Sequence, residues 1–61
     1  MNATIAAHEA VKRAHMARFE ALASLQRAKQ SGDTQAQNRA QRRVDDATHR
    51  LIMAEREAAR V

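Results

Sequence analysis

A single glycine and no proline interrupt the 61 residues of this chain, and the glycine, Gly32, stands at its middle. The residues on both sides of Gly32 are dominated by alanine, arginine and glutamine, which are strong helix formers. A glycine just past a helix end can adopt the left-handed conformation that closes the last turn. The sequence therefore predicts one domain, residues 1–61, with helices over about 3–30 and 34–60 and a turn at 31–33.

Capping residues are found at both predicted helix starts. Asn2 or Thr4 can cap the first helix through a side-chain oxygen, and Asp33 or Thr34 can cap the second. Thr34 followed by Gln37 also matches a capping box, in which two side chains bond reciprocally to backbone N–H groups. These candidates support a turn that ends just before the second helix.

Both halves of the chain carry a seven-residue repeat of alanine and larger apolar residues. The alternating spacings of three and four are typical of a coiled-coil seam. The seam positions are Thr4, Ala7, Val11, Ala14, Arg18, Ala21, Leu25 and Ala28, then Gln37, Ala40, Val44, Ala47, Leu51, Ala54, Ala58 and Val61. If the chain folds back at Gly32, most layers set an alanine against a larger group, so facing positions interdigitate. The predicted fold class is all-α, an antiparallel two-helix hairpin with an alanine-rich seam.

Arg18 is the one charged residue in this seam. We expect its aliphatic stem to lie over Ala47 while the guanidinium reaches water. The alternative is a buried ion pair with Asp45 or Asp46 that fixes the register of the two helices.

Large apolar residues also occur outside the seam, on one side of the hairpin. This side, the apolar flank, contains Ile5, His8, His15, Phe19, Leu22, Thr48 and Ile52. A two-helix hairpin cannot bury these residues, and a chain this short is marginal without a disulfide, which its lack of cysteine excludes. We expect the flank to dock on a second copy to form a four-helix bundle. Alternatively, its apolar residues are ordinary surface.

Two histidines belong to the apolar flank. His8 and His15 are about 10 Å apart along one helix, too far to share a metal ion within it, and we expect neither a metal nor a cofactor. We expect the pair to be polar filling at an interface edge; the alternative is an interface sensitive to pH, since histidine titrates near neutrality.

The net charge of +4 is concentrated near the turn. Residues 24–44 hold five basic side chains against the single acid Asp33, whereas basic and acidic residues balance in the remainder. This basic turn consists of Arg27, Lys29, Arg39, Arg42 and Arg43. It can be a solvated surface, a site for an acidic protein, or a grip on a nucleic-acid backbone that weakens in salt.

No pattern of an active site is found in the sequence. There is no cysteine or tyrosine, no glycine-rich phosphate loop, and no serine with a base beside it on the same helix. Asp45 and Asp46 are adjacent and point about 100° apart on a helix, so they cannot act as a carboxylate pair. We expect no enzyme and no small-molecule substrate. Without a signal peptide or a membrane-spanning stretch, we expect a cytoplasmic protein that does not bind membranes.

The tetrapeptide MARF, Met16 to Phe19, together with chain length and hairpin layout, resembles the small plasmid Rop proteins. The resemblance is architectural, and it implies a hairpin that dimerises into a four-helix bundle and binds paired RNA loops. Our expectation is a non-enzymatic, homodimeric regulator, inhibitor or adaptor that binds another protein. The alternative is a Rop-like regulator that binds RNA or DNA through the basic turn.

Overall fold

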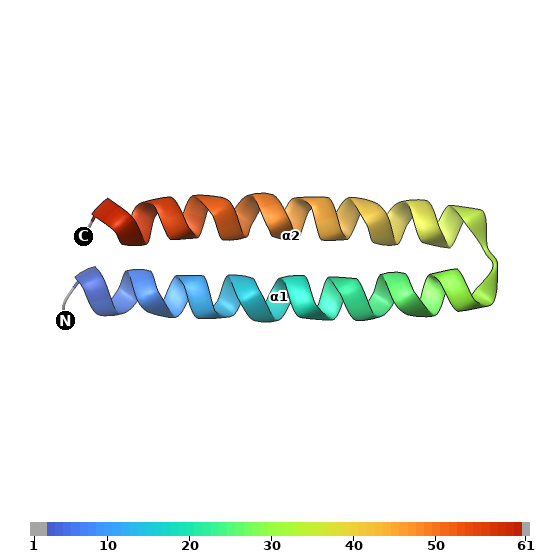
Figure 1. Cartoon of the computed structure of the whole chain (residues 1–61), viewed down its shortest axis with the longest axis horizontal. Coiled ribbons are helices and arrows are strands. Elements are labelled where there is room, and N and C mark those ends of the chain that lie inside the picture. The colour runs from blue at the N-terminus through green and yellow to red at the C-terminus, as the bar shows by residue number, and fades with distance from the viewer. Residues whose placement is uncertain (1–2, 61) are drawn as a thin grey trace.

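The computed structural model describes residues 3–60, which form a helical hairpin (Figure 1). Helix α1 spans Ala3–Ser31 and α2 spans Thr34–Arg60. The helices run antiparallel, side by side, and together measure 46 × 13 × 12 Å between Cα atoms. The start of α1 and the end of α2 lie at one pole and the turn at the other. The all-α hairpin that the sequence predicts is confirmed.

Gly32 closes α1 through its backbone conformation. Its φ of 75° lies in the left-handed region, and its N–H donates a hydrogen bond of 3.4 Å to the carbonyl of Lys29. Ser31 contributes a second closing bond, from Oγ to the carbonyl of Ala28 at 2.7 Å. No heavy atom lies within 4 Å of the position that a Cβ would take at Gly32. The turn therefore requires glycine for its dihedral angle and not for lack of space.

Asp33 caps α2. Its Oδ1 accepts hydrogen bonds from the backbone N–H groups of Gln35 at 3.0 Å and Ala36 at 3.2 Å. Its carbonyl accepts the N–H of Gln37 at 3.0 Å, the first bond of the helical ladder. Thr34 is consequently the first residue of the helix, and the capping box predicted for Thr34 and Gln37 is wrong by one position.

The start of α1 lies at the edge of the described residues. Because α1 begins at Ala3, Thr4 stands inside the helix and does not precede it as a cap. The other candidate, Asn2, lies outside the described residues, as does the seam position Val61.

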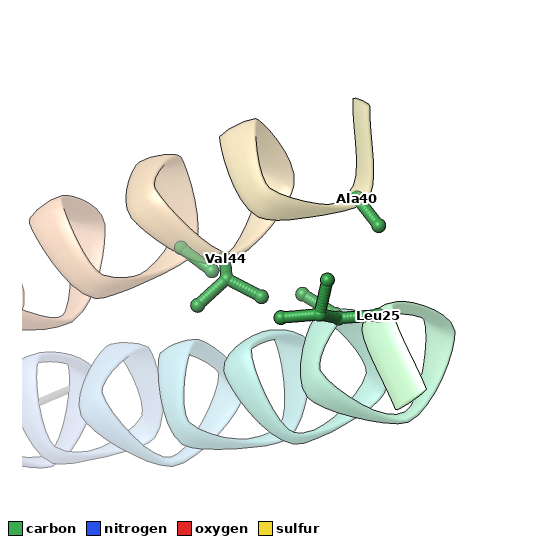
Figure 2. Packing of buried hydrophobic residues seen from close by; sticks show 5 residues of the cluster. Leu25, Ala40 and Val44 are labelled. Atoms are coloured by element: carbon green, nitrogen blue, oxygen red, sulfur yellow. The ribbon is translucent and has the colours of Figure 1, made fainter. Parts of the chain in front are cut away.

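The predicted seam forms the core. Every seam residue among those described is buried or half-buried, and the buried members are Ala7, Ala21, Leu25, Ala40, Val44, Ala47 and Leu51. Figure 2 shows Leu25 of α1 reaching between Ala40 and Val44 of α2. Since alanine fills more than half of the buried positions, the core is thin.

Arg18 finds a partner that the sequence does not reveal. Its Nε donates to Oγ1 of Thr48 at 3.1 Å, and that hydroxyl donates onward to the carbonyl of Val44 at 2.8 Å. Within residues 3–60, no ion pair joins Arg18 to Asp45 or Asp46, so the ion-pair alternative is wrong. Arg18 is half-buried. Its hydrogen bond to the neutral hydroxyl of Thr48 shows that these two residues lie at the same level of the hairpin.

Candidate interaction surfaces

The apolar flank is uncovered in the single chain. The exposed fractions are 74% for Phe19, 56% for Ile5, 42% for Ile52 and 38% for Leu22. These residues are exposed because the seam places other side chains between the helices and turns the flank away from them. Leu22 and Ile52 are less exposed than Phe19, so they form the inner part of the flank and Phe19 its outer part.

The polar members of the apolar flank differ in their surroundings. His8 and His15 are exposed, whereas Thr48 is half-buried and bonded to Arg18. Phe19 lines an open hollow together with His15, Met16, Arg18, Glu20 and Leu22. All of its lining residues belong to α1, so the hollow is an indentation of the surface and not a ligand cavity.

The opposite side of the hairpin, the charged flank, is a shallow groove between the helices. Alanines such as Ala17, Ala21 and Ala47 form its floor. Charged side chains of both signs line it: Arg13, Glu20, Arg39, Arg43, Asp46 and Arg50. Four of the six large apolar side chains that are exposed among the described residues thus lie on the apolar flank, and most of the mixed charge lies on the other flank.

The residues of the basic turn are all exposed. Arg27 donates a hydrogen bond from Nη2 to Oγ of Ser24 at 3.1 Å. Arg39 and Arg43 line one hollow together, near the turn, whereas Arg42 lies about 100° around the helix from Arg43. The structure thus brings two of the five basic residues to one groove and distributes the others around the hairpin.

Ion pairs do little to neutralise this basic region. Among residues 3–60 the one ion pair joins Arg60 and Glu57 at 3.3 Å, at the other pole. The basic side chains near the turn therefore keep their charges available to an anionic partner.

Chemical groups for catalysis or metal binding do not converge within residues 3–60. No group of three or more histidine, cysteine or acidic side chains is placed to hold a metal ion in this part of the chain. The hollows among the described residues are open surface grooves. Neither α1 nor α2 contains an apolar stretch of the length needed to cross a membrane.

No family model, no curated protein and no solved structure matches this chain. The resemblance to the Rop proteins accordingly remains one of the MARF tetrapeptide, the chain length and the hairpin layout.

Proposed function

We propose that the chain is a non-enzymatic interaction protein that acts in the cytoplasm as a homodimer and serves as a regulator, inhibitor or adaptor of another protein. The observation that carries this proposal is the exposure of Phe19, Ile5, Leu22 and Ile52 along one flank of a hairpin with a thin core.

The burial of these four side chains would rival that of the seam. Full burial of one side chain of this size contributes roughly 1.5–3 kcal/mol. Among the seven buried residues of the hairpin, only Leu25, Val44 and Leu51 are larger than alanine. A second copy on the apolar flank would supply the missing burial and produce a four-helix bundle.

Sedimentation measurements test the dimer. We expect the wild-type chain to sediment as a dimer, and Phe19→Ala or Ile52→Asp to shift it toward monomer. Met53→Ala is the matched control, because Met53 is a large exposed apolar residue outside the apolar flank. Circular dichroism on the same samples separates loss of association from loss of helix. A wild-type monomer, or a dimer mass unchanged in both flank variants, contradicts the proposal.

The basic turn supports a second candidate function, a regulator that binds RNA or DNA. Its five basic side chains are exposed, and arginine forks suit phosphate oxygens. Heparin, duplex DNA and structured RNA at two salt concentrations test this, with Arg39, Arg42 and Arg43 all changed to alanine. Binding that weakens in salt and disappears in the triple variant favours the nucleic-acid function. If the wild-type chain does not bind, the protein-partner proposal stands alone.

A further inference from the structure

We propose that the second copy docks on the apolar flank with its turn at the opposite pole. The two-fold axis then passes beside Phe19, and Lys29 faces Glu55 of the partner subunit. This arrangement rests on the proposed homodimer and specifies its geometry, which neither the fold nor the apolar flank alone decides.

The position of Phe19 along the hairpin is the first argument. Helix α1 spans Ala3–Ser31, so Phe19 lies two residues from its middle. The hydrogen bond from Arg18 to Thr48 brings the middle of α2 to the same level. The most exposed of the large apolar side chains therefore stands halfway between the poles. If a two-fold axis perpendicular to the helices passes at this level, the two hairpins lie against each other along their full length. Phe19 then lies against Phe19 of the second copy.

Lys29 and Glu55 provide the second argument. Lys29 lies ten residues beyond Phe19 toward the turn, about 15 Å away at 1.5 Å per residue. Glu55 lies seven residues beyond Thr48 toward the other pole, which puts it about 12 Å from the level of Phe19. The two-fold axis therefore brings Lys29 of one copy to nearly the same level as Glu55 of the other copy. Both side chains are long enough to reach each other there.

Lys29 and Glu55 also occupy the correct side of their helices. Lys29 follows His8, His15 and Leu22 at intervals of seven residues, and Glu55 follows Thr48 at the same interval. Both side chains are exposed, and neither makes a hydrogen bond or an ion pair with another described residue. Each is therefore available to a partner that approaches the apolar flank.

The overall charge distribution is the third argument. With both turns at one pole, two regions of +4 would lie side by side, Lys29 would meet Lys29, and Glu55 would meet Glu55. With the turns at opposite poles, the basic residues, which lie about 6–15 Å from the two-fold axis along the hairpin, are set about 12–30 Å from their copies, beyond the screening length of roughly 8 Å at physiological salt. Electrostatic repulsion thus disfavours the first arrangement and not the second.

The charged flank is a poorer surface for the same symmetry. A two-fold axis there would place Arg13 at nearly the level of the partner's Arg43, because both lie about 6–9 Å from the middle on opposite sides. The apolar flank avoids this repulsion. The hairpin is 46 Å long and 13 Å across between Cα atoms, so one face covers about 600 Å², the lower end of the roughly 600–1,000 Å² that each partner buries in a standard interface.

Charge reversal tests the arrangement. We expect Lys29→Glu and Glu55→Lys, each alone, to raise the dimer dissociation constant about three- to tenfold, because each creates two like-charged pairs. The double variant Lys29→Glu with Glu55→Lys should return to the wild-type value. The matched control is Arg56→Glu, which changes the net charge as Lys29→Glu does but is exposed on the outer side of α2. If neither single variant differs from this control, the arrangement is wrong.

Cross-linking gives an independent readout, since residues 3–60 contain no cysteine and an introduced thiol is unique. Lys29→Cys and Glu55→Cys should each cross-link poorly to themselves through a short bismaleimide, and efficiently when mixed. Efficient cross-linking of Lys29→Cys to itself would place both turns at one pole and overturn this inference while leaving the homodimer intact. A monomeric wild-type chain in sedimentation would overturn both.

Discussion

At the scale of single residues, the turn depends on two neighbours with different tasks. Gly32 supplies a φ of 75°, and Asp33 satisfies two backbone N–H groups at the start of α2. The sequence predicted the task of Gly32 uniquely, because the chain has no other glycine. It left Asp33 and Thr34 as equal candidates for the cap, since both side chains can accept such bonds and only the backbone path decides between them.

Asp33→Ala should lower the free energy of unfolding by about 1 kcal/mol, because the first N–H groups of α2 lose their acceptor. Urea unfolding followed by circular dichroism measures the change. Asp33→Ser is the control, since serine retains an oxygen that can cap the helix, and it should unfold close to the wild type. Equal losses in the two variants would show that the cap contributes little.

Arg18→Leu should leave the stability unchanged or raise it. The seam position is half-buried, leucine suits it, and the Thr48 hydroxyl keeps its bond to the carbonyl of Val44 after Arg18 is replaced. Thermal unfolding of the variant beside the wild type measures the effect. A loss greater than about 1 kcal/mol would show that the bond to Thr48 stabilises the hairpin more than apolar packing can.

At the scale of the helices, the seam was predictable because it depends only on spacing. The seven-residue repeat predicts which residues face inward, and the position of Gly32 predicts which seam residues of the two helices pack against each other. The partner of Arg18 was not predictable, since several acceptors lie within reach of a long side chain and its rotamer depends on local packing. The sequence does offer Thr48 as a candidate partner of Arg18, because Thr48 follows Ala47, the seam residue that faces Arg18, and lies on the flank directly beside it.

Leu25→Ala should destabilise the hairpin by about 2–5 kcal/mol, since it removes one of the few large buried side chains and leaves a cavity against Ala40 and Val44. Urea unfolding at a fixed protein concentration measures the loss. Gln30→Ala is the control on the same helix, because Gln30 is exposed and its replacement should change stability by less than about 0.5 kcal/mol. Similar effects of the two substitutions would contradict the role of the seam as the core.

At the scale of the whole molecule, the exposure of the apolar flank was predictable from the sequence, but the arrangement of a second copy on it was not. The repeat that fills the seam also excludes Phe19, Ile5 and Ile52 from it, and the structure confirms that they are exposed. The arrangement of a second copy on this flank needs the folded hairpin, because the bond between Arg18 and Thr48 sets the levels of Phe19 and Glu55 relative to each other.

The melting temperature should rise with protein concentration, because dimerisation stabilises the folded hairpin by mass action. Thermal unfolding over a hundredfold range of concentration measures this dependence. In Phe19→Ala the dependence should weaken or vanish, whereas Met53→Ala should retain it. A melting temperature independent of concentration in the wild type would refute the coupling between folding and self-association.

At the pole remote from Gly32, the first residues of α1 and the last residues of α2 lie next to each other and no turn connects them (Figure 1). With a donor dye on one of these ends and an acceptor dye on the other, resonance energy transfer would be strong while the helices are packed together. The transfer efficiency would fall as the ends of the helices separate. Because the labels stand far from the arginines around the turn of the same chain, such a sensor in the Phe19→Ala variant, which we expect to be shifted toward monomer, could follow fraying of the helices while an anionic target is bound.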